Sequence, residues 1–519
     1  MSEKYYADEI NFEKAYDEAI GLLRSLLAGS ECGPIGFVAS NLDIDNYKRL
    51  FTRDTFWIGM AALLSGEPDL IGGFRSSLEV LRDTQRRDDG AIASNVSCDG
   101  KVSYGIINPR VDPTSLYIIG CVEYYRHTGD GSFLAAFIPS VRGAMGYLED
   151  VWENKACGLL YIPRAGNWAD EYFQQGFVLY DEVLWNIALK KYAYALKELG
   201  DGRAGEYREK ASGVKKLIRE KFWIKNTDVR EDHVYRSMRK KLDLNRAGYF
   251  LHFYYSGDKV KADFAHAHGI FDAFGNSLAL LEGFPGETQR EHLLRFVDIV
   301  SDNWYPLIPA HYPFFKENTF RSKKLHQFRF KESIGHYHNG GLWPWYTGVF
   351  VSALAKAGED MRAIRFLHGI LRANAQEKDG HKFHEYHSMK KSEAILEVVR
   401  PEGLDLYFSM KLSHLVSTHR SNMRVKYRNF KVDVTDRLCE PLLLPKQGER
   451  VRFGTVGPDA KDVLLTIPFM KDRSGRRYFR NVEMRSIRSE PDGTGNLGVS
   501  AAAYVIAYKA VAEGKILFA

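Results

Sequence analysis

Apolar residues recur at helical spacing along most of the chain up to about residue 380. In residues 11–28 they fall three or four positions apart on one stripe, which predicts an amphipathic helix. That stripe consists of Phe12, Ala15, Ala19, Leu22, Leu23 and Leu26. The same spacing predicts further helices over 54–65, 68–86, 113–128, 132–153, 180–199, 202–222, 270–283, 287–302, 341–357 and 360–375. Several of these segments are followed by glycine, which commonly ends a helix.

The connections between the predicted helices are of two kinds. Residues 199–202 form a short turn, whereas other connections are long and rich in Trp, Tyr, Asn, Asp and Gly. The long ones are 87–110, 157–179, 303–340 and 378–395. Long loops inside a compact domain usually carry function. The pattern therefore predicts a mainly α protein in which paired helices form a ring, with long functional loops at one end.

Residues 416–495 follow a different pattern. Residues 424–428 and 430–434 alternate apolar and polar positions like exposed strands, and residues 463–467 have the apolar run of a buried strand. A last helix is expected over 499–513. The domain boundaries that follow are 1–415 plus 496–519 for a helical domain and 416–495 for a small β-rich insertion.

Composition places the chain among ordinary globular proteins. Of its 519 residues, 45% are hydrophobic and 27% are charged, and the 13% of aromatic residues often stand beside polar ones. The formal charge of +6 is small for this length and gives no reason to expect a nucleic-acid partner. No apolar run approaches the roughly 18 residues that a membrane span needs, so no membrane partner is expected either.

The N-terminus and the cysteines bear on the compartment. The first residues are polar and acidic, unlike a secretion signal. The five cysteines are scattered and form no CxxC pair, which favours a reducing compartment. We therefore predict a cytoplasmic protein, and the sequence leaves open whether it forms a homo-oligomer.

The segment 336–345 carries the densest set of candidate ligand-binding groups. It reads His-Tyr-His-Asn-Gly-Gly-Leu-Trp-Pro-Trp. Aromatic rings offer flat apolar faces with polar edges, which suits a sugar ring. Gly340 and Gly341 let a ligand approach the main chain closely, although they also fit a plain turn into a helix. Glu385 then follows in a second aromatic setting, Phe-His-Glu-Tyr. Together these segments indicate a carbohydrate-processing enzyme with a carboxylate in its cleft.

Two further loops place arginine close to aspartate. Asp54 stands at the start of a predicted helix, where it can cap the helix or accept hydrogen bonds from sugar hydroxyls. Arg53 beside it would hold that carboxylate through charge-assisted bonds. Arg110 and Asp112 close a long loop, and Asp112 opens the next helix, so capping competes with ligand binding there too.

The loop 166–176 supplies a pair of adjacent carboxylates, Asp170 and Glu171, among aromatic and amide side chains. Such surroundings can raise the pKa of a carboxyl group for general-acid work, although carboxylates on surface loops are usually just solvated. Glycosidic cleavage needs two carboxyl groups, which in an inverting enzyme lie about 6.5–9.5 Å apart. Asp170 and Glu385 are our candidates for this pair, and Glu171 and Glu182 remain alternatives for the acid.

Three evenly spaced histidines are candidate ligands for a metal ion. His381, His384 and His387 are spaced by three, as zinc ligands on one helix face would be. Gly380 and the aromatic neighbours favour a loop, and the zinc-helix pattern of two histidines four apart with an intervening glutamate is absent. We therefore expect no metal site.

At these motifs the chain resembles the inverting glycoside hydrolases with an (α/α)6 barrel, including the neutral/alkaline invertases, the amylo-α-1,6-glucosidases and α-glucosidase relatives. The motifs span roughly residues 50–390 and occur in the family-like order. They are Arg53-Asp54, Arg110-Val111-Asp112, Trp168-Ala169-Asp170, Asp272–Asn276, Tyr337–Pro344 and Phe383–Tyr386. The His-Asn-Gly-Gly-x-Trp-Pro element is the most specific of them.

The resemblance implies an (α/α)6 barrel that hydrolyses small glycosides or oligosaccharides, α-glucosides or sucrose-like sugars, without a cofactor. It implies that Asp170 is the general acid and Glu385 the general base. The candidate substrate-binding residues are Arg53, Asp54, Trp57, Tyr104, Arg110, Asp112, Trp168, His338, Asn339, Gly340, Trp343 and His384.

Three other functions stay open at this point. A sugar epimerase would use histidine bases on a similar helical ring, and an inverting phosphorylase would cleave its substrate only with phosphate. A non-catalytic glycan-binding protein would need neither carboxylate for its function.

Overall fold

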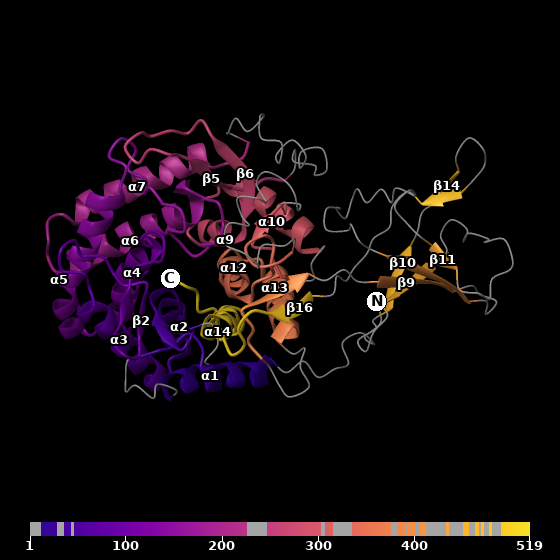
Figure 1. The fold of residues 1–519 in the computed structure, drawn as a ribbon, viewed down its shortest axis with the longest axis horizontal. Coiled ribbons are helices and arrows are strands. Elements are labelled where there is room, and N and C mark those ends of the chain that lie inside the picture. The colour runs from indigo at the N-terminus through magenta and orange to yellow at the C-terminus, as the bar shows by residue number, and fades with distance from the viewer. Residues whose placement is uncertain are drawn as a thin grey trace.

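The computed structural model describes residues 12–28, 36–42, 46–225, 247–302, 307–314, 335–374, 382–389 and 489–518, and seven strands between Glu393 and Phe479. Two layers of helices dominate the part outside those seven strands (Figure 1). The inner helices are α2 (Thr52–Ser65), α4 (Asp112–Thr128), α6 (Leu179–Glu198), α9 (Ala273–Leu281), α12 (Pro344–Lys356) and α14 (Gly498–Glu513). The outer helices are α1 (Phe12–Ala28), α3 (Pro68–Asp83), α5 (Gly131–Tyr147), α7 (Ala204–Lys221), α10 (Glu287–Asp302) and α13 (Asp360–Asn374).

The inner helices close into a ring. Each packs against the next in the order α2, α4, α6, α9, α12 and α14, and α14 packs back against α2. Five inner helices are each covered by one outer helix (Figure 1). The outer helix α3 packs on α2, α5 on α4, α7 on α6, α13 on α12 and α1 on α14. Within the described residues, inner and outer helices alternate along the chain. The pairs α2–α3, α4–α5, α6–α7 and α12–α13 are each consecutive in sequence, whereas α1 and α14 join the two ends of the chain.

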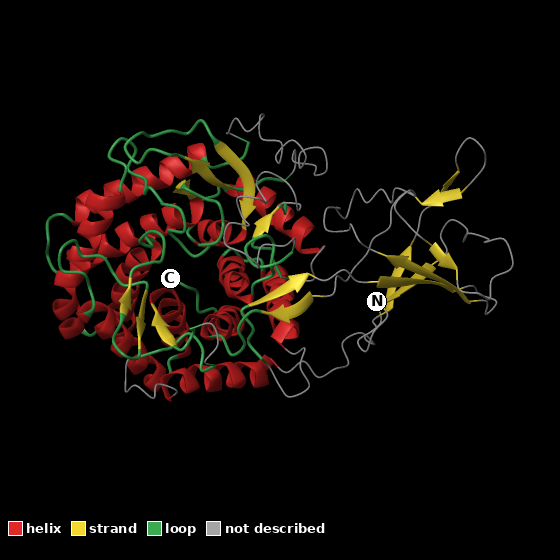
Figure 2. Ribbon diagram, viewed as in Figure 1, coloured by secondary structure: helices red, strands yellow, loops and turns green. Residues whose placement is uncertain are grey.

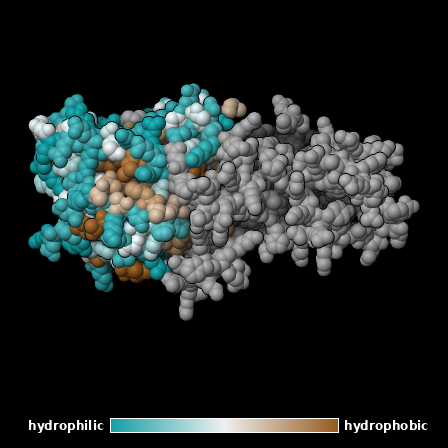
Figure 3. Space-filling model, turned by 90° about the horizontal axis from the view of Figure 1, so that it is seen from above, coloured by the Kyte–Doolittle hydropathy of each residue, from teal (hydrophilic) through white to brown (hydrophobic). Residues whose placement is uncertain are grey.

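Burial explains which helices lie inside. Every residue of α2 except Ser65 is buried, and α12 and α14 are buried over most of their lengths. A helix that is apolar all round must be enclosed by others. By contrast, α3 buries only one face, which carries Leu70, Phe74, Leu78 and Leu81. Figure 3 shows that hydrophilic residues cover most of the visible surface of the described part.

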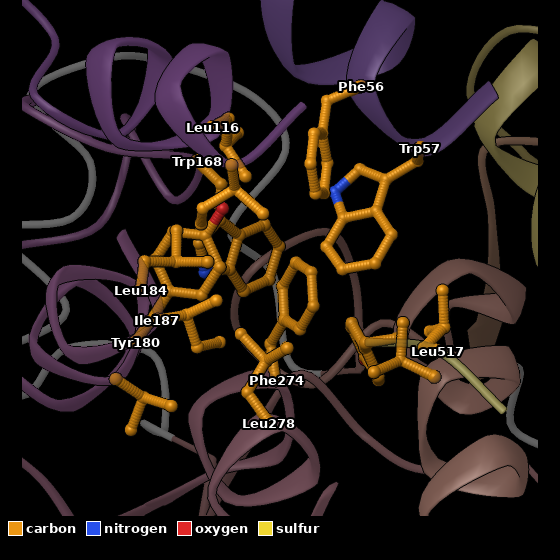
Figure 4. Packing of buried hydrophobic residues seen from close by; sticks show 14 of the residues in the cluster. Phe56, Trp57, Leu116, Trp168, Tyr180, Leu184, Ile187, Phe274, Leu278 and Leu517 are labelled. Carbon is orange, nitrogen blue, oxygen red and sulfur yellow. The ribbon is translucent and has the colours of Figure 1, made fainter. Parts of the chain in front are cut away.

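The centre of the ring is filled by side chains rather than left open. Trp57 packs against Phe56, Phe274 and Trp345, with ring centroids 5.0, 5.5 and 6.2 Å away (Figure 4). Leu517, beyond α14, lies in the same cluster, and its backbone N–H donates to Ser352 of α12 at 3.2 Å. This packing fixes the relative positions of the inner helices, on whose first turns the site is built.

Short strands occupy the long loops, where the residue pattern predicted few strands (Figure 2). One antiparallel sheet has the order β1-β2-β3 and another β4-β5-β6-β7. Their bounds are β1 (Arg49–Phe51), β2 (Asn95–Ser97), β3 (Val102–Ser103), β4 (Gly176–Val178), β5 (Leu251–Tyr255), β6 (Ala267–Asp272) and β7 (His311–Tyr312). Because β1, β4 and β6 run directly into α2, α6 and α9, the sheets hold the loops at the starts of these inner helices.

Two predicted helix boundaries were wrong for related reasons. Residues 270–272 belong to β6, and α9 begins only at Ala273, where Asp272 caps the helix by accepting the N–H of Phe274 at 3.0 Å. Gly340 and Gly341 precede α12, which begins at Pro344. Proline at the first helical position fixes this start. The last helix, α14, was predicted almost to the residue.

Residues between α13 and α14 contribute the remaining strands. The strands are β8 (Tyr386–Met389), β9 (Glu393–Val399), β10 (Asp405–Lys411), β11 (Val432–Val434), β12 (Arg450–Thr455), β13 (Asp462–Thr466), β14 (Phe469–Lys471), β15 (Arg477–Phe479) and β16 (Ser489–Asp492). One sheet has the order β11-β10-β9-β12-β13, and β8 pairs with β16. The predicted strand 424–428 lies outside the described residues.

Two features bear on the compartment. Cys98 is disulfide-bonded, and its partner lies outside the described residues, whereas Cys121 and Cys157 are free thiols. A disulfide is not what a reducing compartment favours, so the cytoplasmic location stays a prediction. None of the described helices combines the length and the hydropathy that crossing a membrane requires.

Candidate active site

The first turns of the inner helices bring charged residues together at one end of the ring. Arg53 of α2 forms two hydrogen bonds with Asp112 of α4, from Nε to Oδ2 at 2.8 Å and from Nη2 to Oδ1 at 3.2 Å. Tyr180 of α6 donates to the same Oδ2 at 3.4 Å. All three side chains are buried. This bidentate ion pair therefore joins the starts of three successive inner helices.

The expected partner of Arg53 was wrong. Its hydrogen bonds go to Asp112 and not to the adjacent Asp54. The capping alternative is excluded for both aspartates, because neither α2 nor α4 has a side-chain cap and both residues lie inside their helices. Asp54 is thus a buried carboxyl in a first helical turn that caps nothing.

The surroundings of Asp54 favour its neutral form. Burial, with the charge of Glu385, raises the pKa of this carboxyl from 3.8 to about 7, against the opposing charges of Arg53 and Arg110. A carboxyl group with such a pKa carries a proton much of the time near neutral pH. Asp54 can therefore donate a hydrogen bond as well as accept one.

Glu385 is buried and held on both of its oxygens. The hydroxyl of Tyr47 donates to Oε1 at 2.7 Å, and the backbone N–H of Thr494 donates to Oε2 at 3.2 Å. The backbone N–H of Glu385 donates in return to the carbonyl of Thr494 at 2.9 Å. Gly493, with φ at +71°, lies so close that an added Cβ would overlap Oε2. Both oxygens of the Glu385 carboxyl group are thus held by donors.

Asp170 lies nearer to solvent than Glu385 does. Its side chain is 24% exposed and forms a short ion pair with Nη2 of Arg110, which is 12% exposed. The loop of Arg110 is fastened to the loop of Asp170 by the side chain of Asn108, which donates to the carbonyl of Arg164 at 2.9 Å. The two candidate residues Arg110 and Asp170 are thus direct partners.

The charges of the two candidate catalytic carboxylates affect the pKa values of the same two tyrosines, Tyr47 and Tyr337. Burial raises the pKa of Tyr47 well above 10, and the charges of Glu385, Asp54 and Asp170 raise it further. Burial likewise raises the pKa of Tyr337, and Glu385 and Asp170 again add to the shift. Asp170 and Glu385 are 215 positions apart in the sequence, yet the charges of both bear on the pKa of Tyr47 and of Tyr337.

An aromatic wall connects the loops that carry these acids. Trp168 lies 5.7 Å from Trp343, and Trp343 stacks on Tyr386 at 5.4 Å with an interplanar angle of 23°. Tyr337 contacts both Trp343 and Tyr386, at 5.4 and 5.6 Å. Trp168 stands two residues before Asp170, and Tyr386 directly follows Glu385. The wall thus runs from one candidate acid to the other.

The glycine-rich segment before α12 lies against this wall. His338 is fully buried, with its ring edge-on to Trp168 at 5.2 Å and parallel to Trp343. Gly340 has φ at +102°, and an added Cβ would overlap the ring of Phe314. Asn339 is also buried. The backbone conformation and the ring of Phe314 therefore require glycine at position 340, whether or not a ligand approaches it.

Three other candidates have different surroundings. Trp57 is fully buried in the central cluster of Figure 4. The hydroxyl of Tyr104 donates to the carbonyl of Thr84 at 3.0 Å, and its ring lies 4.7 Å from the guanidinium of Arg86. His384 is tied through its carbonyl, which accepts from Ser500 at 2.7 Å.

The alternative acids differ from each other. Glu182 is completely buried, accepts the N–H of Leu160 at 3.0 Å, and has a pKa raised well above 4.5 by burial. The charge of Glu171 acts on Tyr337 as that of Asp170 does. Glu171, which is adjacent to Asp170 in the sequence, therefore stays an alternative for the general acid.

Burial keeps two histidines of the site neutral. Burial lowers the pKa of His311 and of His387 from 6.5 to about 3. No group of three or more histidine, cysteine, aspartate or glutamate side chains fit to hold a metal occurs among the described residues. His381, one member of the histidine trio, lies outside them.

Sequence reasoning missed Tyr47 and Thr494. Tyr47 lies in the loop before β1, and Thr494 follows β16, so neither belongs to a recognisable motif. The only sequence signal was Gly493 beside Thr494, in a Gly-Thr-Gly run before the last helix.

No family model matches the chain. In sequence it is similar to the probable alkaline/neutral invertase D of Arabidopsis thaliana, with 23% identity over 413 residues, which are 67% of this chain and 72% of the invertase. In fold it is similar to a bacterial glucoamylase complexed with acarbose, with a TM-score of 0.52 and 15% identity over 97% of this chain and 56% of that one. The chain thus matches little more than half of the glucoamylase.

A second solved structure with a similar fold covers most of its own length. It is a mannosylglycerate hydrolase of glycoside hydrolase family 63 from Thermus thermophilus in complex with glucose, with a TM-score of 0.51 and 12% identity over 72% of this chain and 94% of that one. These similarities confirm the resemblance that the motifs predicted. In fold the chain is thus similar to solved glycoside hydrolases. In sequence it is similar to a plant invertase.

Proposed function

We propose that the protein is an inverting glycoside hydrolase that acts on α-glucosides or sucrose-like oligosaccharides, with Asp170 as general acid and Glu385 as general base. The observation that supports the proposal is the aromatic wall from Trp168 through Trp343 to Tyr386, which connects the loops of the two carboxylates. The charges of both carboxylates also raise the pKa of Tyr47 and of Tyr337. In an inverting enzyme two such groups stand on opposite sides of the scissile bond.

The surroundings of each carboxylate support its role. A general base must be ionised, and the hydrogen bonds from Tyr47 and Thr494 stabilise the carboxylate of Glu385. A general acid must reach the leaving oxygen, and Asp170 is the more exposed of the two. The leaving group would depart past Asp170 and Arg110, while Glu385 would activate a water molecule on the buried side.

The sugar to be cleaved would lie against the wall formed by Trp168 and Trp343. Asp54 would donate to or accept from a sugar hydroxyl, because its pKa of about 7 permits both. Arg53 would act by fixing Asp112, and Asn339 would supply an amide to the pocket. The remaining candidates Trp57, Tyr104 and His384 would support these groups from behind.

The framework of the proposal is an (α/α)6 barrel. The closed inner ring and its outer partners support this architecture. The strands before α14 would form the β-rich insertion. Because β9 and β10 share a sheet with β12, we place its start near Glu393 rather than at residue 416.

Substitution of the two acids tests the proposal. With a panel of α-glucosides and sucrose, Asp170→Asn and Glu385→Gln should each lower kcat by about 100-fold or more, as loss of acid–base catalysis does. Asp83→Asn, whose side chain is 65% exposed on α3, is the matched control and should leave kcat unchanged.

The same assay separates the alternatives. Release that requires phosphate would identify a phosphorylase, and conversion of a free monosaccharide would identify an epimerase. Sugar binding without release by the wild type, unchanged in both variants, would identify a glycan-binding protein. Any of these results would overturn the proposed hydrolysis.

A further inference from the structure

The loop that carries Asp170 is fastened by a buried chain of polar side chains beneath it. His252 of β5 binds Oε1 of Gln174 through Nε2, and Nε2 of Gln174 donates to Oδ1 of Asn167, both at short distance. Nδ2 of Asn167 then donates to Oδ2 of Asp181, in the first turn of α6, at 2.7 Å. Three separate elements are joined in this way.

The direction of every hydrogen bond in this chain is fixed by chemistry. An amide nitrogen only donates and an amide oxygen only accepts. Because Oε1 of Gln174 accepts, Nε2 of His252 must carry the proton, and burial keeps this histidine neutral by holding its pKa well below 6.5. The chain therefore runs one way, from His252 to the carboxyl group of Asp181.

The chain also holds the main chain next to Asp170. Oδ1 of Asn167 accepts the backbone N–H of Ala169 at 3.1 Å, and Nε2 of Gln174 donates to the carbonyl of Ala169 at 3.3 Å. The backbone N–H of Tyr172 donates to the same carbonyl at 3.0 Å. Both peptide groups of Ala169 are thus fixed, and Asp170 is the next residue.

Burying this chain of polar side chains costs free energy, which a role in positioning the loop of Asp170 would explain. Asn167, Gln174, Asp181 and His252 are each at most 1% exposed. Burying polar side chains is unfavourable unless their partners are in place, and an ordinary surface loop does not need them. The rings of the neighbouring Tyr172 and His311 stack on His252 at 5.5 and 4.4 Å and lock it in turn.

We propose that Asn167 and Gln174 are positioning residues for the general acid, which they place by fixing the peptide groups of Ala169. The inference rests on the proposed function, in which Asp170 protonates the leaving oxygen. Neither residue is a proposed contact of substrate. Substituting either residue should therefore lower kcat/KM most for substrates whose leaving group must be protonated, and least for substrates whose leaving group needs no proton.

Leaving groups of different basicity test this distinction. Gln174→Met keeps the length of the side chain and removes both of its polar atoms. We would compare kcat/KM of the wild type and the variant on methyl α-glucoside, 4-nitrophenyl α-glucoside and α-glucosyl fluoride. A misplaced acid should cost about 100-fold on the methyl glucoside and less than about fivefold on the fluoride, which needs little acid assistance.

Gln175→Met is the matched control. The neighbouring glutamine bonds outside the chain, to the hydroxyl of Tyr161 at 2.7 Å and the carbonyl of Ser256 at 3.3 Å. It should leave the dependence on the leaving group unchanged. Should Gln174→Met fail to fold, Gln174→Asn shortens the side chain by one methylene and should give the same pattern.

The outcomes are distinct. An equal loss on all three substrates, or no loss on the methyl glucoside, in a folded Gln174 variant would overturn the positioning role while leaving hydrolysis intact. Failure of the wild type to release glucose from any of the three would overturn the proposed function, and this inference with it.

Discussion

The hydroxyl of Tyr47 donates a 2.7 Å hydrogen bond to Oε1 of Glu385, across 338 positions of sequence. The bond joins the loop before α2 to the loop after α13, where Glu385 is buried and Tyr47 is partly buried. It places the proposed base at the seam where the first and last parts of the helical ring meet.

Removing this hydroxyl should impair the base. In Tyr47→Phe, Oε1 of Glu385 loses its donor in a buried setting, which costs about 1–3 kcal/mol when a buried acceptor is left unpaired. We expect kcat to fall by about tenfold or more on that scale, as measured by steady-state kinetics. Tyr125→Phe is the control, because it removes another tyrosine–glutamate bond, to Glu198 at 3.1 Å, at an exposed site. Equal kcat in the two variants would contradict the role of Tyr47.

Gly493 should be required for activity for two reasons. Its backbone conformation favours glycine, and a side chain at this position would displace Glu385. Any L-residue there adopts a left-handed φ, which costs about 1–2 kcal/mol, and its Cβ would also overlap Glu385. Gly358 has nearly the same φ, +73°, but open space around it. We expect Gly358→Ala to lower stability alone and Gly493→Ala to lower both stability and kcat, as measured by thermal unfolding and kinetics. Full kcat in Gly493→Ala would refute the packing argument.

The pKa of Asp54 predicts how stability depends on pH. The unfolded chain loses this proton near 3.8, whereas the folded protein keeps it up to about 7. Between these values the folded state binds more protons, so the free energy of unfolding falls as the pH rises. In Asp54→Asn that part of the decline should vanish.

Denaturant titrations of the wild type and Asp54→Asn between about pH 4 and about pH 7 measure this difference, which should grow with pH and reach a few kcal/mol, at about 1.4 kcal/mol per pKa unit. Asp272, whose pKa burial also raises to about 7, should leave a residual slope in the variant. The exposed Asp99, with a pKa of about 2, is the control, since Asp99→Asn should leave the slope unchanged. Parallel curves for the wild type and Asp54→Asn would contradict the shift.

The sequence predicted the parts of this account that depend on local patterns. The helices followed from apolar periodicity and glycine stops, and Asp170 and Glu385 stood out because each lies among aromatic residues in a long loop. The short strands β4 to β7 were missed because segments of two to six residues give little periodic signal.

Long-range partners were out of reach for a different reason. Arg53 was paired with its neighbour Asp54, but the geometry of the ring gives it Asp112, 59 positions away. Tyr47 and Thr494 reach Glu385 over 338 and 109 positions. Which side chain completes a buried hydrogen bond depends on how the helices close, and one sequence alone does not specify that closure.

The stereochemistry of the first product tests the central claim most directly. Proton NMR of an α-glucoside treated with the enzyme, recorded before mutarotation, distinguishes the anomers of the glucose released. Water activated by Glu385 on the face opposite to the leaving group should give β-glucose first. Release of α-glucose first would contradict the account, because it would require Glu385 or another carboxylate to act as a nucleophile.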